Sequence, residues 1–322
     1  MAESAAPSPH GVGVGAAGAP DEDGARDYGK KRKLPLATEP GTPFSDANGE
    51  PLVPVRAKSL GGIPVVEHLS RSELLHGQRT GEIGMLHSWE LVTAVDGPGT
   101  RMTTFVAGCP LRCLYCHNPD TIGTRHGLPV RVGDLLKRIK RYRGVFTATG
   151  GGITLSGGEA LAQPAFVRQV LAGAKAKGIH TALDTSGFLG QSADDAMLAD
   201  IDLVLLDVKA GDEETYGKVT GRALKPTLEF GRRLSAAGIE TWIRFVLVPG
   251  LTDDDATIEP IADYAASLGS VTRVEVLPFH QMGSGKWTEL GMTYLLADTL
   301  PPTPESVDWV RGIFRSRGLA TY

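Results

Sequence analysis

The stretch MTTFVAGCPLRCLYCHNPD, residues 102–120, contains all three cysteines of the 322-residue chain. Its first seven residues are β-branched or apolar and predict a strand that ends at Gly108. Cys109, Cys113 and Cys116 follow this strand directly, with the spacing C-x3-C-x2-C. We therefore expect the cysteines in a loop at the carboxyl end of a strand, close enough together to hold one metal centre.

Strands of this kind alternate along the chain with segments whose apolar residues recur every three or four positions, the pattern of amphipathic helices. Parallel neighbouring strands need such crossover helices, so the alternation predicts a parallel sheet covered by helices. The predicted strands begin at Met102, Gly151, Ile179, Asp202, Glu240 and Thr272, and the predicted helices span residues 132–143, 164–178, 193–200, 224–238 and 252–269.

Polar clusters lie where these strands end. Their positions distinguish between the two folds that the alternation allows, a barrel and an open doubly wound sheet. A closed or nearly closed barrel gathers the carboxyl ends of all its strands into one cleft, whereas an open doubly wound sheet brings together only those near its switch point. The pattern therefore favours an α/β barrel. Besides the cysteines, the clusters are Gly157-Gly158-Glu159, Asp184 to Gly187, Asp207 to Lys209 and Pro278 to His280.

Composition and charge limit the classes of function. With 41% hydrophobic residues the chain is long enough for one large core. A formal net charge of -4 gives no reason to expect nucleic acid or an anionic membrane as a partner.

Three clustered cysteines cannot form a closed disulfide framework, so we expect reduced thiols and a cytoplasmic protein. The N-terminus lacks the pattern of a secretory signal, and no run of about 18 apolar residues predicts a membrane span.

Residues 1–80 differ in composition from the rest of the chain. They are rich in Gly, Ala, Pro and charged residues without sustained periodicity, which predicts a disordered N-terminal extension. We interpret the basic run GKKRKLP, residues 29–35, as a solvated part of this extension, with a localisation or nucleic-acid patch as the alternative. Residues 81–322 are expected to form one domain.

Three kinds of metal chemistry are compatible with the cysteine loop. The alternative without a metal is that the three cysteines are unrelated buried residues. Cys113 to His117 match C-x-x-C-H, the attachment pattern of c-type haem, but this leaves Cys109 unused and requires export. Zinc bound by the three cysteines and His117 would be tetrahedral, but His117 directly follows Cys116, and adjacent residues seldom reach the same ion. A 4Fe-4S cluster normally has four thiolate ligands, so three would leave one iron with an open coordination position.

The cysteine spacing, with Tyr115 before the last cysteine, resembles the signature of radical S-adenosylmethionine enzymes. From about Gly81 to Tyr322 the chain is similar to the family of pyruvate formate-lyase-activating enzymes, whereas residues 1–80 depart from that family. The motifs that carry the similarity are IGMLHSWELVTAVDGPGTR (83–101), GCPLRCLYCHNPDT (108–121), GGGITLSGGEAL (150–161), GIHTALDTSGF (178–188), VLLDVK (204–209), WIRFVLVPG (242–250) and VEVLPFHQMGSGKW (274–287).

This resemblance implies a partial six-stranded (β/α) barrel, a 4Fe-4S cluster on Cys109, Cys113 and Cys116, and S-adenosyl-L-methionine bound to the open iron. It also implies an oxygen-sensitive activity of anaerobic metabolism. One electron, from flavodoxin or ferredoxin, cleaves S-adenosylmethionine to methionine and a 5′-deoxyadenosyl radical, which removes a hydrogen atom from a glycine of formate acetyltransferase. We expect a monomer. The alternatives are an activating enzyme for a different glycyl radical enzyme and a zinc-stabilised binding module without catalysis.

The resemblance assigns cofactor-binding roles to two of the strand-end clusters. Gly157, Gly158 and Glu159 are expected to meet the methionine amino group of S-adenosylmethionine, since glycines allow close backbone approach and an ammonium group needs an oxygen nearby. Asp184 and Thr185 are expected to hold a monovalent cation beside the carboxylate of the cofactor. An Asx turn at the strand end is the alternative for this pair.

Four further residues are expected to contact S-adenosylmethionine by resemblance. Asp207 and Lys209 share one face of a strand, and a plain ion pair is the alternative. His280 follows Pro278 at the end of the last predicted strand. Tyr115 is expected near the adenine, with a buried core tyrosine as the alternative.

Two residues match positions that, in the family that the chain resembles, hold the glycine loop of the partner protein. These are Asp96, within DGPG, and Arg244, within WIRF, and their expected contact is peptide backbone or charge pairing. His117 has no such support and is interpreted as a residue that packs near the site.

Overall fold

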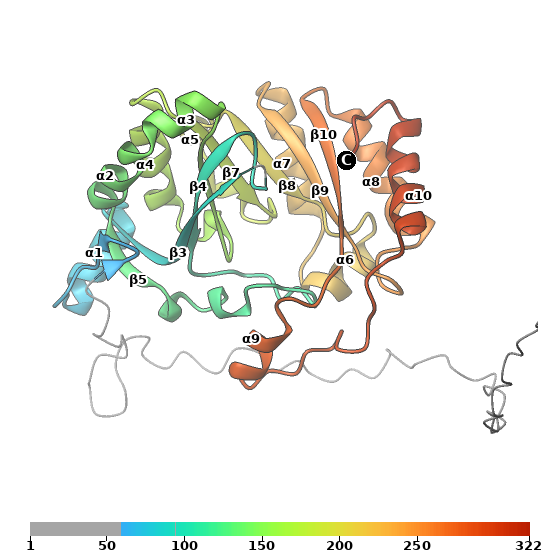
Figure 1. Ribbon diagram of the computed structural model, residues 1–322, viewed down its shortest axis with the longest axis horizontal. Coiled ribbons are helices and arrows are strands. Elements are labelled where there is room, and N and C mark those ends of the chain that lie inside the picture. The colour runs from blue at the N-terminus through green and yellow to red at the C-terminus, as the bar shows by residue number, and fades with distance from the viewer. Residues whose placement is uncertain (1–58, 94) are drawn as a thin grey trace, which may run out of the picture. The chain divides into compact units, whose positions relative to one another are not determined.

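An eight-stranded sheet forms the centre of the computed structural model, which describes residues 59–93 and 95–322. Its strands are β3 (Ile83–Thr93), β4 (Thr100–Val106), β5 (Leu128–Arg131), β6 (Gly152–Gly157), β7 (His180–Thr185), β8 (Leu203–Asp207), β9 (Glu240–Leu247) and β10 (Val271–Pro278). They are arranged in the order β10-β9-β8-β7-β6-β4-β3-β5 (Figure 1). Because β10 and β5 lie at opposite ends of this order, the sheet is an open barrel, as the predicted fold class requires.

Six strands form one parallel run and confirm the six predicted strands. Along β10, β9, β8, β7, β6 and β4, every adjacent pair is parallel. The register places Val106 opposite Gly157 and Asp207 opposite Arg244, so predicted site residues from different strands reach the same level. β3 pairs antiparallel with both β4 and β5. The sequence pattern did not predict these two antiparallel strands.

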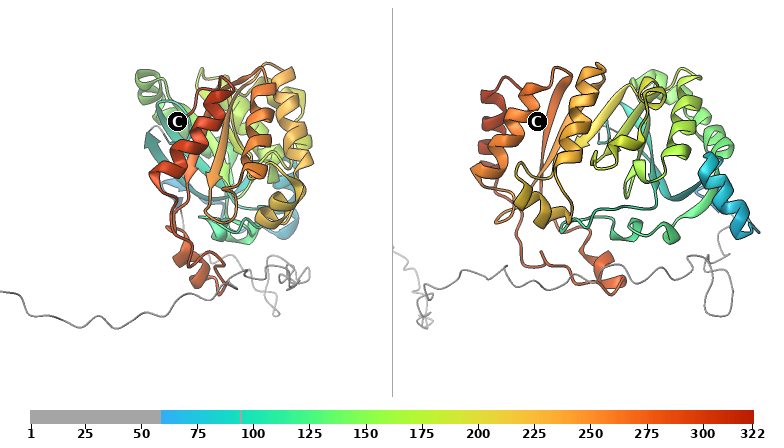
Figure 2. Two further views of the ribbon diagram at one scale, coloured as in Figure 1. Left: turned by 90° about the vertical axis from the view of Figure 1, so that its right-hand side faces the viewer. Right: turned by 180° about the vertical axis from the view of Figure 1, so that it is seen from behind.

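Helices pack on one face of the curved sheet (Figure 2). α2 (Val132–Arg141), α4 (Pro164–Lys175), α5 (Asp195–Ala199), α7 (Lys225–Ala236) and α8 (Asp255–Ser267) confirm the predicted helices. Additional helices are α3 (Arg143–Thr149), α6 (Glu213–Thr220), α9 (Ser284–Glu289) and α10 (Pro304–Ser316). One core cluster joins the two layers, and it includes Val170, Leu234 and Ile261 from helices and Leu155 and Val204 from strands, all at most 1% exposed.

Local sequence explains where several helices begin. Asp194, Asp212 and Asp254 accept a hydrogen bond from the backbone N–H three residues later, which satisfies a free donor at the first turn of α5, α6 and α8. Pro164 occupies the first turn of α4, where its missing N–H costs nothing. Gly178, which follows α4, has a φ of 65°, so the chain turns there in a conformation that favours glycine.

The segment before Gly81 differs from the expected disordered extension. Residues 59–80 form β1 (Ser59–Leu60), β2 (Ile63–Pro64) and α1 (Arg71–Thr80), and α1 begins with a capping box between Ser70 and Glu73. Ile63 is fully buried and Leu74 is 5% exposed. The expectation of disorder is therefore wrong for residues 59–80, because this segment buries apolar surface against the domain. Residues 1–58, including GKKRKLP, lie outside the described residues.

A helix that crosses a bilayer needs roughly 18 or more mostly apolar residues. None of the helices within residues 59–93 and 95–322 is both long and apolar enough to cross a membrane.

Two adjacent leucines test whether α1 belongs to the folded domain. Leu74 is 5% exposed and Leu75 is 47% exposed. We expect Leu74→Ala to lower the free energy of unfolding by roughly 2–4 kcal/mol, because it removes buried methyl groups and leaves a cavity. Leu75→Ala should change it by less than about 0.5 kcal/mol. Urea unfolding followed by circular dichroism measures both values, and equal stabilities would show that α1 does not contribute to the fold.

Candidate functional site

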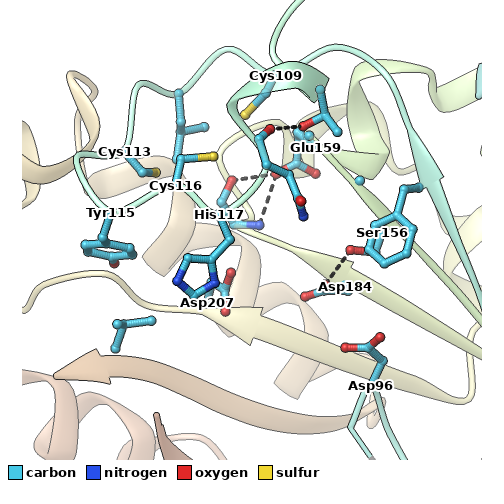
Figure 3. A pocket seen from close by; sticks show the side chains of 18 of the residues that line it. Asp96, Cys109, Cys113, Tyr115, Cys116, His117, Ser156, Glu159, Asp184 and Asp207 are labelled. Carbon is cyan, nitrogen blue, oxygen red and sulfur yellow. Dashed lines mark hydrogen bonds between the residues drawn. The ribbon is translucent and has the colours of Figure 1, made fainter. Parts of the chain in front are cut away.

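A cavity of about 910 Å³ lies at the carboxyl ends of the parallel strands. Figure 3 shows the cysteines at one end of this cavity and Asp96 at the other. The structure brings every residue predicted for the site to its wall, namely Asp96, Cys109, Cys113, Tyr115, Cys116, Gly157, Gly158, Glu159, Asp184, Thr185, Asp207, Lys209, Arg244 and His280. Their roles stay predictions, but their convergence on one cavity is a property of the fold.

Backbone hydrogen bonds hold the cysteine loop in place. The N–H groups of Arg112 and Leu114 donate to the carbonyls of Thr220 and Val219, at the end of α6. The N–H of Cys109 donates to the carbonyl of Ile122. The loop is therefore fixed on two sides before any ligand is bound.

The three thiols are partly exposed to the cavity but removed from bulk solvent. Burial raises the pKa of Cys113 to about 12, and it also raises the pKa values of Cys109 and Cys116. The free thiols are thus protonated at neutral pH. Iron would bind them as thiolates and displace the protons, which is the usual coupling between metal binding and proton release.

His117 does not turn toward the cysteines. Its ring stacks on the ring of His280 with centroids 4.2 Å apart, and its Nε2 lies 3.1 Å from the His280 carbonyl oxygen. Within residues 59–93 and 95–322, no three His, Cys, Asp or Glu side chains converge on a position for a single metal ion. His117 therefore packs beside the site, as interpreted from the sequence.

Two glycines let the loop after β6 lie directly on the cysteine loop. Gly157 has a φ of 130°, a conformation that side chains with a Cβ rarely adopt. A Cβ on Gly158 would lie 2.6 Å from the Gly108 carbonyl oxygen and 2.8 Å from that of Thr121. The N–H of Glu159 donates to the Gly108 carbonyl across this contact. Any side chain at position 158 would therefore push the two loops apart.

The Glu159 carboxylate holds the loop after β7. Glu159 is 3% exposed and accepts hydrogen bonds from Thr185 Oγ1 at 2.6 Å, from Ser186 Oγ at 2.6 Å and from the Ser186 N–H at 3.0 Å. The Leu161 N–H supplies a fourth bond, at 3.0 Å. This contact between strand-end loops was not foreseen from the sequence.

Hydroxyl groups, rather than the Asp184 carboxylate, close the turn after β7. Thr185 Oγ1 accepts from the Gly187 N–H, and Ser186 Oγ accepts from the Phe188 N–H. The Asp184 carboxylate instead accepts from Ser156 Oγ at 2.6 Å and pairs with Arg244. The alternative of an Asx turn at Asp184 is therefore wrong.

Arg244 lies among acidic side chains at the centre of the cavity. Its guanidinium is 3.2 Å from Asp184 and 3.8–3.9 Å from Asp96, Asp207 and Glu275. Burial raises the pKa of Asp184 to about 7, and the neighbouring carboxylates act in the same direction while Arg244 opposes them. Four carboxyl groups therefore crowd one guanidinium, and a further cation beside Asp184 would offset part of their repulsion.

Lys209 forms the ion pair that was the alternative to a cofactor contact, and Tyr115 is buried, as its alternative stated. Both residues nevertheless line the cavity. Lys209 Nζ lies 3.0 Å from the Asp207 carboxylate, so the ion pair is present. Tyr115 is 6% exposed and belongs to a small apolar cluster with Val248 and Phe279. Lys209 Nζ also lies 5.8 Å from the centre of the Tyr115 ring. Both side chains are therefore packed from behind and present one side to the cavity.

Unsatisfied polar atoms at this cavity indicate that it binds a polar ligand. Tyr115 Oη, Arg244 Nε and His280 Nδ1 are buried and have no hydrogen-bond partner within the described part of the chain. Each such atom costs about 1–3 kcal/mol unless something bonds to it. All three residues line the same cavity, but the three atoms are covered in this conformation, so a polar ligand would pair with them after a small shift of the side chains.

Sequence reasoning missed a contact between α9 and the cysteine loop. Trp287 Nε1 donates to the Cys116 carbonyl at 2.9 Å. Lys286 Nζ donates to Asn118 Oδ1 at 2.9 Å and lies 3.0 Å from the Asp120 carboxylate. Both residues stand in the motif VEVLPFHQMGSGKW, so a signal was present, but nothing in the sequence indicated their partners. The contacts of Ser156 with Asp184 and of Glu275 with Arg244 were missed as well, because the sequence does not indicate which residues meet across strands.

The fold and the three-cysteine loop define a radical S-adenosylmethionine enzyme. The Radical SAM superfamily model matches residues 103–259. A radical SAM methyltransferase from Sphaerobacter thermophilus has a similar fold, with a TM-score of 0.50, 17% identity, and coverage of 80% of this chain and 75% of that one.

More specific similarity comes from curated relatives. The pyruvate formate-lyase 1-activating enzyme of Escherichia coli (strain K12) is 42% identical over 238 residues, which are 73% of this chain and 97% of that protein. The pyruvate formate-lyase-activating enzyme of Clostridium pasteurianum is 41% identical over 216 residues, 67% of this chain and 90% of that protein. The chain belongs to the pyruvate formate-lyase-activating enzyme family. It is a radical S-adenosylmethionine enzyme whose cofactors are a 4Fe-4S cluster and S-adenosyl-L-methionine.

The contact at Gly158 predicts how the cysteine loop responds to one methyl group. We expect Gly158→Ala to retain roughly half or less of the native iron after anaerobic reconstitution, because overpacking displaces the loop. Gly144→Ala is the control, since a Cβ at Gly144 on α3 would meet nothing within 4 Å. Iron and sulfide analysis measures the effect, and equal iron in both variants would contradict it.

The Trp287 contact predicts a change in how firmly iron is held. Trp287→Phe removes the donor to the Cys116 carbonyl but keeps an aromatic ring. One hydrogen bond contributes about 1 kcal/mol, so we expect a chelator to extract iron roughly fivefold faster. Trp309→Phe on α10, where the side chain is 46% exposed, should extract at the native rate. Loss of the brown absorbance under a ferrous chelator follows the reaction.

Proposed function

We propose that the protein activates formate acetyltransferase, the pyruvate formate-lyase, by generating a glycyl radical on it. The observation that carries this proposal is the similarity to activating enzymes over 97% of the length of the Escherichia coli relative. The fit of the cavity supports it: three thiols on one loop, and three unsatisfied polar atoms on the same wall. An activating enzyme for a different glycyl radical enzyme is the second candidate, because the cavity itself does not identify the partner.

In this proposal the cysteine loop holds the cluster and the other strand-end loops orient the cofactor. Cys109, Cys113 and Cys116 would be the iron ligands. The chemistry supplied by the bound cluster is the one-electron cleavage of S-adenosylmethionine to methionine and a 5′-deoxyadenosyl radical. Gly157 and Gly158 keep the backbone close to the cluster loop, where it can meet the methionine amino group.

The charge on the cavity wall suits a cationic cofactor. Glu90, Asp96, Glu159, Asp184 and Asp207 outnumber the cations of Lys209, Arg244 and Lys286 on the wall. A surplus of carboxylates attracts a sulfonium group, an ammonium group or a monovalent cation, and burial strengthens that attraction. We propose that Asp184 and Thr185 hold the monovalent cation.

The remaining cofactor contacts are proposed for residues that line the cavity at the end of β8 and in three loops. Asp207, Lys209, His280 and Tyr115 would contact S-adenosylmethionine, and a small shift of the side chains would let His280 Nδ1 and Tyr115 Oη supply donors or acceptors for it. Glu159 would act mainly by fixing Thr185 and Ser186, since its carboxylate is occupied by them.

Asp96 and Arg244 are proposed to hold the glycine loop of the partner. Asp96 lies at the end of the cavity away from the cysteines (Figure 3), and the Arg244 guanidinium lies 3.9 Å from its carboxylate, so an entering peptide would meet both charged groups. We propose flavodoxin or ferredoxin as the electron donor and a monomer in the cytoplasm as the acting form.

Anaerobic reconstitution tests the proposed function directly. Protein loaded with iron and sulfide is mixed with S-adenosylmethionine, a reductant and formate acetyltransferase, and the glycyl radical is measured by electron paramagnetic resonance. The native protein should produce the radical signal, whereas Cys113→Ala should lose both its iron and the signal.

Two other outcomes would redirect the assignment. If 5′-deoxyadenosine forms without a glycyl radical on formate acetyltransferase, the enzyme acts on a different partner. If elemental analysis finds one zinc and no iron in anaerobically purified protein, the chain is a zinc-stabilised binding module.

A further inference from the structure

Arg101, on β4, carries a buried positive charge without a carboxylate beside it. Its side chain is fully buried, and among the described residues no Asp or Glu oxygen lies within 4.0 Å of its guanidinium. Burial lowers the pKa of Arg101 to about 10, although the more distant charges of Asp96 and Asp202 act in the opposite direction, and the group stays charged at neutral pH. A buried charge without an ion pair is costly, and an apolar residue of similar size would suit a strand core better. A reason for this charge must therefore lie in what it contacts.

The guanidinium donates to neutral acceptors from three segments. Nε donates to Thr154 Oγ1 at 2.7 Å, Nη1 donates to the Pro98 carbonyl at 3.2 Å, and Nη2 donates to the Ile153 carbonyl. Both Nη atoms lie 3.3 Å from Nδ1 of His180. One of these acceptors, the Pro98 carbonyl, belongs to the loop between β3 and β4 that carries Asp96.

Thr154, on β6, links Arg101 to the backbone of Asp96. Arginine has no acceptor, so the Thr154 hydroxyl must accept from Arg101 Nε and direct its own hydrogen elsewhere. It donates that hydrogen to the Asp96 carbonyl at 2.7 Å. The polarity of the relay is therefore fixed, from Arg101 through Thr154 to Asp96.

The same loop is held at two further points. Thr103 Oγ1 donates to Asp96 Oδ2 at 3.0 Å, which orients the carboxylate. Gly97, with a φ of 113°, lies on the stem of Arg101, since a Cβ there would be 3.0 Å from Arg101 Cδ. Gly99 also has a positive φ, of 66°. A loop with two such glycines has great conformational freedom, so side-chain anchors determine its position.

We propose that Arg101 and Thr154 are positioning residues that hold the Asp96 loop in place for the peptide of the partner protein. This inference rests on the proposed function, in which Asp96 contacts that peptide. The anchored loop keeps the Asp96 carboxylate 3.9 Å from Arg244 at the far end of the cavity from the cysteines (Figure 3). The partner then meets a loop that is already ordered and does not lose affinity in ordering it.

Thr154→Val tests the relay with little change in volume. It removes the acceptor for Arg101 and the donor to Asp96, whereas replacing Arg101 itself could prevent folding. Thr181→Val on β7 is the matched control, because Thr181 is equally buried and its hydroxyl donates to the Asp200 carbonyl at 2.6 Å, away from this loop.

Two measurements on these variants separate a positioning role from a structural one. For Thr154→Val, we expect the KM for formate acetyltransferase to rise roughly fivefold to tenfold, as for the loss of one or two hydrogen bonds. Iron content and 5′-deoxyadenosine formation without the partner should stay within about twofold of native. Thr181→Val should leave all three values at the native level. A parallel fall in iron content and partner-free cleavage would overturn the inference, because the role of Thr154 would then be structural.

Hydrogen–deuterium exchange of residues 95–100 provides a readout that needs no partner. Thr154→Val should increase exchange in this segment, and Thr181→Val should not. Unchanged exchange in Thr154→Val would overturn the inference even if the native protein makes the glycyl radical. If the native protein makes no radical while the exchange result holds, the anchoring is supported and the choice of partner in the proposed function fails.

Discussion

The close contact between the cysteine loop and the loop after β6 determines where the three thiols lie. Gly158 places its backbone against the carbonyls of Gly108 and Thr121, at a distance that no side chain would allow. The Glu159 N–H then bonds to Gly108, while the Glu159 carboxylate binds the loop after β7. One glycine and one buried carboxylate therefore connect three strand ends, and the position of each strand-end loop depends on the others.

A second constraint comes from charge. The acidic side chains around Arg244 come from the loop before β4 and from β7, β8 and β10, and the parallel register brings them to one level. Burial disfavours the charged form of Asp184, and the neighbouring carboxylates repel it, so both effects raise the pKa of Asp184. Arg244 offsets only part of the repulsion. The carboxylates around Arg244 therefore favour the binding of a further cation, and this is the property that a sulfonium cofactor needs.

The sequence predicted the parallel strands and the strand-end residues well, because both depend on local patterns. An apolar run followed by a polar cluster is visible without knowledge of its neighbours, and the barrel brings such clusters together. β3 was missed because its polar residues, such as His87 and Glu90, line the cavity and break the apolar pattern of a strand. The segment 59–80 was missed because its few apolar residues look insufficient alone, although Ser70 and Glu73 carry a capping signal. The partners of Lys286 lie 166 and 168 residues away, a separation that sequence patterns do not encode.

Arg101 and Glu159 each use a buried charged group to hold a loop, and their charges are opposite. Arg101 is buried and donates to carbonyl, hydroxyl and imidazole acceptors, whereas Glu159 is buried and accepts from N–H and hydroxyl donors. Within the described residues neither has an ion-pair partner within 4.0 Å. The acceptors around Arg101 belong to β6, β7 and the Asp96 loop, and the donors to Glu159 belong mainly to the end of β7 and the loop after it. Hydrogen bonds to a charged group are short and directional, which fixes the loop more precisely than apolar packing would. Burial of an unpaired charge lowers stability. Both charges hold loops that reach the cavity, and a displaced loop there would impair function more than a small loss of stability would.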